Sequence, residues 1–250
     1  NAPQYIYKDD RDVLVRQLTP FAKIDTSILH FDELSEQNRL RLLKEIEATE
    51  RSESQVSEIK RRNRIDGLLD QAKKSYLEGE ADRAIDIYGK VLEKNPENIL
   101  AWLNMGNILK GQKRFSAAEI AYKRTLEINP FYLYGSIALA QLYIESKYPE
   151  KALDVLKSVR KWHTRDSEVS LYMGLAFAFQ KKPDLAVKEF QNAIRIDPEF
   201  DLPYYYTGVQ YFGSHPDISR KNLKIFIDLS SDKPGKQDLI FKARRLLSKL

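Results

Sequence analysis

Residues 99–130 read ILAWLNMGNILKGQKRFSAAEIAYKRTLEINP, and the outline of this stretch recurs along the chain at a fixed step of 34 residues. Small residues at this spacing form one series: Ala72, Gly106, Ala140, Gly174 and Gly208. Alanines form a second series 12 residues further on: Ala84, Ala118, Ala152 and Ala186. A repeat of this length indicates that the chain is built from stacked copies of one structural unit.

Each repeat predicts two helices followed by a stop. Small residues fall in both halves of the repeat, where they let two helix axes approach closely. The second half ends at Asn95-Pro96, Asn129-Pro130 or Asp197-Pro198, because proline disfavours helical geometry in the preceding residue and has no N–H to donate. We therefore expect helical hairpins over five ranges: 65–98, 99–132, 133–166, 167–200 and 201–232.

The second unit carries the pattern most completely, in Trp102, Met105-Gly106, Leu109, Ala118, Tyr122 and Pro130. In these residues the chain resembles the tetratricopeptide repeat (TPR) family. The resemblance covers about residues 65–232. It departs in the third unit, where Ser136 replaces the aromatic residue and Thr164 replaces the proline. It implies an all-α fold, a right-handed α-solenoid of TPR helical hairpins.

The two ends of the chain differ from the repeats. After Gly235, apolar residues at helical spacing predict a C-terminal capping helix over residues 233–250: Leu239, Ala243, Leu246, Leu247 and Leu250. Residues 1–64 predict a partly helical N-terminal extension. Within it, Pro20 limits a first helix to about Asp10–Leu18, and Ser35 is a candidate cap for a second helix. The polar segment 50–64 fits a solvated helix running into the first repeat, a linker, or one strand of a weak coiled coil.

Composition excludes several classes of protein. The 250 residues include no cysteine, which excludes disulfides, thiol nucleophiles and cysteine metal sites. The net charge of +5 is concentrated in residues 219–250, which hold nine basic and three acidic side chains, whereas residues 1–64 hold twelve of each. The repeats are close to neutral, which disfavours nucleic acid as a ligand of the groove. The basic residues of the closing helix predict a solvated face or a docking patch for acidic protein, lipid headgroups or nucleic acid.

Enzymatic chemistry is not indicated by the residue inventory. His30, His163 and His215 lie far apart in the sequence, and no phosphate-binding, metalloprotease or nucleophile-elbow motif occurs. We therefore expect a non-enzymatic protein with no catalytic, cofactor-binding or metal-binding residues and no cofactor.

The family resemblance implies a protein-binding groove. In TPR arrays the first helices line a concave surface and present the second, fifth, ninth and twelfth positions of each unit. Transferred to this chain, these positions give the predicted partner-binding residues: Leu69, Lys73, Tyr76, Leu103, Asn107, Lys110, Tyr134, Ile137, Gln141, Ile144, Leu171, Leu175, Tyr205, Val209 and Phe212. We expect an apolar groove with Tyr205 and Phe212 as anchors, filled either by a partner or by residues 3–30 of the chain itself.

The function predicted from these features is a protein-interaction scaffold that binds a peptide or helix of a partner in its groove. The carboxylate clamp of chaperone-binding TPR proteins is absent, because Tyr134 and Ala138 stand where basic residues are needed. Two alternatives are a chaperone or assembly factor for a cell-envelope or secretion complex, and a nucleic-acid-linked regulator. Asn1-Ala2 suggests a removed N-terminus, so we expect membrane contact only through an upstream anchor and favour the cell envelope or periplasm over the cytoplasm.

Overall fold

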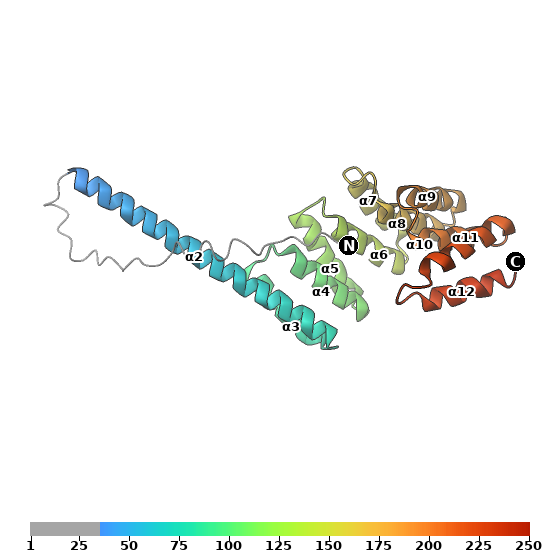
Figure 1. Ribbon diagram of the computed structural model, residues 1–250, viewed down its shortest axis with the longest axis horizontal. Helices are drawn as coiled ribbons and strands as arrows, with labels where there is room; N and C mark the ends of the chain where they lie inside the picture. Colours follow the sequence, from blue (N-terminus) through green and yellow to red (C-terminus); the bar gives the residue numbers. More distant parts are fainter. Residues whose placement is uncertain (1–35) are drawn as a thin grey trace. The chain divides into compact units, whose positions relative to one another are not determined.

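The structure is a computed structural model that describes residues 36–250, and all regular elements in that range are α-helices. The predictions for Asp10–Leu18 and for residues 3–30 lie outside the described residues. The chain forms two compact units, 1–67 and 68–250. The described part of the first unit belongs to helix α2 (Glu36–Leu77), which continues into the second unit (Figure 1).

Helix α2 begins directly after Ser35 and passes without a break through the predicted boundary at residues 64 and 65. Of the three structures considered for residues 50–64, the segment has the first, a helix that runs into the first repeat. Its described side chains are exposed, with Ser52 and Val56 half-buried. The stretch lacks proline, so nothing interrupts its backbone hydrogen bonds, and its polar residues remain in solvent.

The second unit is a row of helical hairpins, shown in chain order in Figure 1. The last turns of α2 are followed by the helices of the array: α3 (Ala81–Lys94), α4 (Ile99–Gly111), α5 (Phe115–Ile128), α6 (Leu133–Glu145), α7 (Pro149–Arg160), α8 (Ser167–Phe179), α9 (Pro183–Ile196), α10 (Asp201–Tyr211), α11 (Pro216–Ser230) and α12 (Gln237–Leu247). The predicted all-α solenoid is confirmed. Helices α4, α6, α8 and α10 begin at the residues that open the predicted units.

The repeated glycines lie where the two helices of a hairpin meet. A Cβ atom added to Gly106 in α4 would lie 2.6 Å from Cε1 of Tyr122 in α5. At Gly208 the nearest atom would be Cγ of Leu223, at 2.7 Å. Tyr122 and Leu223 are completely buried. The 34-residue series of small residues therefore exists because a large side chain of the second helix occupies the space above it.

The turn inside each hairpin also repeats at 34 residues. Lys147 has a positive φ of 63°, and Tyr148 N–H donates to the carbonyl of Tyr143 at 2.7 Å. Together with the bond from Lys147 N–H to the carbonyl of Ile144, this is the Schellman pattern that ends a helix. Residues with positive φ at the equivalent positions are Gly79, Lys113 and Lys181.

The contacts between units give the array its curvature. Each first helix contacts the next one, α4 with α6, α6 with α8, and α8 with α10, whereas successive second helices make no comparable contacts. The first helices are therefore closer together than the second helices. It follows that α4, α6, α8 and α10 lie on the inner, concave side of the array, and that space opens between successive second helices on the outer side.

The C-terminal helix α12 packs on the last hairpin. Ile240 and Ala243 of α12 are buried in one cluster with Tyr205, Leu223 and Phe226. All five predicted apolar residues of α12 and the chain end belong to this cluster. Contrary to the expectation of a uniformly solvated basic face, the Lys236 ammonium lies 3.2 Å from the buried carboxylate of Asp201.

Candidate partner-binding surfaces

The concave side carries most of the predicted partner-binding residues at its surface. Five of them are exposed: Lys73, Tyr76, Asn107, Tyr134 and Val209. Six are half-buried: Leu69, Leu103, Lys110, Gln141, Leu175 and Phe212. Tyr134, at 62% exposure, and Tyr76, at 50%, are large side chains that a partner could reach. Their role as binding residues stays a prediction.

Four predicted groove residues are buried: Ile137, Ile144, Leu171 and Tyr205. The expectation of an accessible apolar stripe is wrong at these positions, because neighbouring units cover them. Leu171 packs with Ala186 and Phe190, and Tyr205 packs against Phe226 with ring centroids 5.1 Å apart. The concave side is consequently less apolar than the sequence predicted, and Tyr205 is a core residue rather than an exposed anchor.

Polar side chains of the concave side are held by contacts between helices. The Tyr122 hydroxyl of α5 donates to Oδ1 of Asn107 at 2.8 Å. This bond leaves the exposed amide nitrogen of Asn107 without an acceptor among the residues described. Lys110 of unit two forms an ion pair with Glu145 of unit three at 3.4 Å. The ammonium and carboxylate therefore join two adjacent units at the concave side.

Glu168 and Tyr172 form a polar group further along the same side. Burial, and then the charge of Asp166, raise the pKa of Glu168. Burial, and then the charge of Glu168, raise the pKa of Tyr172 to about 12. Glu168 has no cationic partner in the part of the chain that the structure describes. Its carboxylate is thus partly desolvated and uncompensated, a condition that an incoming cation would relieve. Sequence reasoning placed Glu168 at a second position but did not identify this role.

A second candidate surface lies on the outer side, between the second helices α7 and α9 and the loop after α7. Two adjoining hollows of about 460 and 620 Å³ share Asn192 and Arg195. The first is also lined by Arg160, Lys188, Glu189 and Gln191, and the second by Thr164, Arg165 and Ile196. We call these two hollows the outer cleft.

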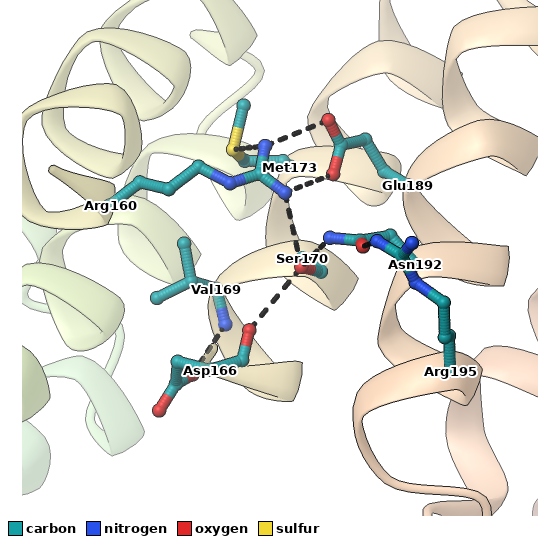
Figure 2. A network of polar contacts seen from close by, with 8 residues as sticks. All are labelled: Arg160, Asp166, Val169, Ser170, Met173, Glu189, Asn192 and Arg195. Carbon is teal, nitrogen blue, oxygen red and sulfur yellow. Dashed lines mark hydrogen bonds and ion pairs between the residues drawn. The ribbon is translucent and has the colours of Figure 1, made fainter. Parts of the chain in front are cut away.

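The inner wall of the outer cleft is a fixed polar network, shown in Figure 2. The Arg160 guanidinium of α7 binds both carboxylate oxygens of Glu189 in α9, at 2.8 and 2.7 Å. Its Nη2 also donates to Oγ of Ser170 at 3.2 Å, and Asn192 Nδ2 donates to the same oxygen at 2.8 Å. Hydrogen bonding to Glu189 raises the pKa of Arg160 against the opposing effect of burial. The network therefore fixes α7, α8 and α9 to one another.

The outer cleft arises where the repeat departs from its own pattern. In units two and five the fourth residue is aromatic and donates to the carbonyl of the preceding proline: Trp102 to Pro96 at 2.8 Å, and Tyr204 to Pro198 at 3.1 Å. In unit four the fourth residue is Ser170, which leaves room for Arg160 and Asn192. Sequence reasoning missed this site, although Ser170 at an aromatic position was a readable signal.

The preceding helix is shorter as well. Helix α7 has 12 residues, whereas α3, α5 and α9 have 14. Thr164 stands at the proline position, and the chain leaves the helix after Arg160, two residues earlier than in the other units. The longer loop places Trp162 against Phe131 of the preceding loop, with ring centroids 4.4 Å apart. Thr164 and Arg165 thereby come to line the outer cleft.

Within residues 36–250, no group of histidine and acidic side chains is arranged to hold a metal ion. His163 and His215, both in loops, contact the Phe131 carbonyl and the Ser214 hydroxyl, respectively. No described helix combines the length and the apolar character needed to cross a bilayer.

Comparison with known proteins agrees with the repeat geometry. Residues 75–134 match the tetratricopeptide repeat family. The chain is 28% identical over 98 residues to protein bimA of Emericella nidulans, a match that covers 39% of this chain and spans only 12% of the length of bimA. Two solved structures are similar: TTC0263, a TPR protein of Thermus thermophilus (19% identity, TM-score 0.62, 74% of this chain and 99% of that chain), and PilW, a type IV pilus biogenesis factor (16%, 0.64, 74% and 86%).

Proposed function

Because this chain is a tetratricopeptide repeat protein, we propose that it is a non-enzymatic scaffold that binds an extended peptide or a helix of a protein partner on its concave side. The observation that carries the proposal is the row of exposed side chains on successive first helices, with Tyr76, Asn107 and Tyr134 as members. Large exposed aromatic side chains beside unsatisfied amide groups are typical of surfaces that bind peptides.

The chemistry of the concave side favours a partner segment that combines apolar and basic side chains. Tyr134 and Val209 offer apolar contact, and the amide of Asn107 offers a donor for a backbone carbonyl. The carboxylate of Glu168 is partly desolvated and has no cation beside it among the described residues. A lysine or arginine of the partner would supply that cation and form a charge-assisted hydrogen bond.

Binding of a C-terminal carboxylate by a basic clamp is not part of this proposal. The second and sixth positions of the third unit are Tyr134 and Ala138, and the nearest cation on the adjoining first helix, Lys110, is already paired with Glu145. A free carboxylate would meet the acidic groups Glu145 and Glu168 on this side.

Site-specific photo-crosslinking tests the proposal. A photoreactive phenylalanine analogue replaces Tyr134 on the concave side in one variant and Ile120 of α5 in the other. Both side chains are exposed, to 62% and 60%, but Ile120 lies on a second helix. We expect a protein from the source cells to crosslink through position 134 and not through position 120. Crosslinking at 120 alone, or equally at both positions, would reject the concave side as the binding surface.

A second arm tests the predicted basic side chain of the partner. Glu168→Gln removes the negative charge and retains the shape of the side chain. We expect a weaker crosslink from position 134 in this variant, by about tenfold if a close ion pair is lost. An unchanged yield would contradict the basic character of the partner but not the site.

A role as an assembly factor for a cell-envelope complex is a second candidate. The observation that favours it is the similarity in fold to PilW, which is described as a type IV pilus biogenesis factor. The same crosslinking experiment separates the two proposals, because a subunit of an envelope or secretion complex as the captured protein would support the assembly role. Capture of a partner unrelated to the envelope would contradict it.

A further inference from the structure

The outer cleft carries three cations that the fold itself does not use. Arg165, Lys188 and Arg195, which we call the cleft cations, are all exposed. Arg165 and Lys188 have no hydrogen-bond or ion-pair partner within the described range 36–250, and Arg195 donates only to the neutral side chain of Asn192, at 2.6 Å. The fourth cation, Arg160, differs because Glu189 neutralises it in a bidentate pair.

The cleft is also built in advance rather than formed by loose surface side chains. The bidentate Arg160–Glu189 pair is largely buried and joins α7 to α9. Asn192 is fixed by donating to Ser170 at 2.8 Å while its Oδ1 accepts from Arg195. The position of Arg195 in the shared wall of the two hollows is therefore set by a chain of hydrogen bonds that leads back to the buried pair. A preorganised cation loses less entropy when it binds an anion.

We propose that the outer cleft binds an acidic peptide segment of a protein partner, with the carboxylates of successive aspartates or glutamates seated on the cleft cations. Arginine and lysine bind carboxylates through short charge-assisted hydrogen bonds. The cleft has one cation of its own in each hollow, Lys188 in the first and Arg165 in the second, and Arg195 between them. This arrangement matches several negative groups spaced along a chain better than one small anion.

The charge of the surrounding array argues for a peptide rather than nucleic acid. Residues 65–218 hold 20 basic and 21 acidic side chains, so the cleft cations form a local cluster without a continuing positive track. A nucleic-acid backbone needs such a track, since its phosphates repeat at short intervals. The proposed site is on the outer side and does not depend on binding at the concave side.

Fluorescence anisotropy with a defined probe tests the inference. The probe is a labelled peptide with six consecutive glutamates, and its neutral counterpart has six glutamines. The test variant is Arg165→Gln/Lys188→Gln/Arg195→Gln in the full chain. The control variant, Lys90→Gln/Lys221→Gln/Lys224→Gln, removes the same net charge from three lysines elsewhere in the array. Thermal melting of both variants checks that they remain folded.

We expect the unaltered protein and the control variant to bind the glutamate peptide, with affinities that differ by less than threefold, and the test variant to bind it at least tenfold more weakly. The glutamine peptide should not bind. Equal weakening in the two variants would overturn the proposal, because it would mean general charge attraction. The proposal would also be overturned if a single-stranded oligonucleotide of six phosphates, or inorganic phosphate at the same concentration of charge, displaced the peptide more effectively than unlabelled glutamate peptide does.

Discussion

The ammonium of Lys236 lies 3.2 Å from Oδ1 of Asp201, 35 residues earlier in the chain. The contact joins the N-terminal end of α12 to the N-terminal end of α10. The second carboxylate oxygen of Asp201 accepts a hydrogen bond from Ser230 at 2.9 Å, and Lys233 lies 3.5 Å away. Asp201 is almost completely buried. The capping helix is therefore fixed by a buried, paired charge in addition to its apolar contacts.

The paired carboxylate makes stability depend on pH. Burial raises the pKa of Asp201, but the hydrogen bonds from Ser230 and Lys236 outweigh it, so the pKa is lowered. The folded pKa then lies below the unfolded pKa. The stabilisation is complete above the unfolded value, about 4, and is lost as the pH falls through the folded value. We expect Asp201→Asn to lower the free energy of unfolding at pH 7 by about 2 kcal/mol. Urea unfolding at pH 7 and pH 3 measures this, and a difference between the two proteins that does not shrink at pH 3 would contradict it.

The capping helix should contribute through its buried face alone. Ile240 is buried in the cluster with Leu223 and Phe226, whereas its neighbour Phe241 is 69% exposed. We expect Ile240→Ala to destabilise the protein by about 2–4 kcal/mol, and Phe241→Ala to change the stability by less than about 0.5 kcal/mol. Removal of the chain after Gly235 should lower the melting temperature further or cause aggregation. A melting curve unchanged by that truncation would refute the capping role.

The glycines at the helix crossing should not tolerate a side chain. We expect Gly106→Ala to cost about 1–3 kcal/mol, because the added methyl group overlaps the buried ring of Tyr122. Gly106→Leu should cost more. The control is Gly89→Ala in α3, where a Cβ meets nothing within 4 Å, and a gain of about 0.5–1 kcal/mol is expected from the better helix propensity of alanine. Thermal melting of the three variants is the measurement. Equal effects at positions 106 and 89 would show that the packing assignment is wrong.

Phe212 tests whether the chain fills its own concave side. It is half-buried, in contrast to Tyr205, whose replacement would damage the core in any form of the protein. If residues 3–30 occupy the concave side, Phe212→Ala should destabilise the full chain and leave a chain that starts at Asp66 unaffected. If the surface awaits a partner, the substitution should have the same small effect in both, below about 0.5 kcal/mol. Differential scanning calorimetry of the four proteins distinguishes these results.

The sequence predicted the hairpins and their register because both depend on residues with strict local requirements. Glycine at positions 106 and 208 and proline at 96 and 198 restrict the backbone wherever they occur, so their spacing reports the repeat directly. The exposure of Ile137 and Leu171 could not be predicted in the same way. It depends on how closely the next first helix approaches, which is a property of the assembled array.

Two other features escaped prediction for related reasons. The course of α2 was left open because a polar helix has no apolar stripe from which to recognise it. The outer cleft depends on two departures acting together, Ser170 at an aromatic position and Thr164 at a proline position. Each looks like ordinary degeneracy by itself, and only the structure shows that they adjoin the same space between α7 and α9.

The early end of α7 has a consequence for how this protein could change over evolutionary time. In a stack of hairpins, each unit contacts only its neighbours, so an irregularity at one junction is not transmitted to the register of the others. The junction between the third and fourth units can therefore vary in loop length and charge while the remaining junctions keep their shared pattern. New partner specificity could arise at this position by a few substitutions, without any redesign of the scaffold that presents it.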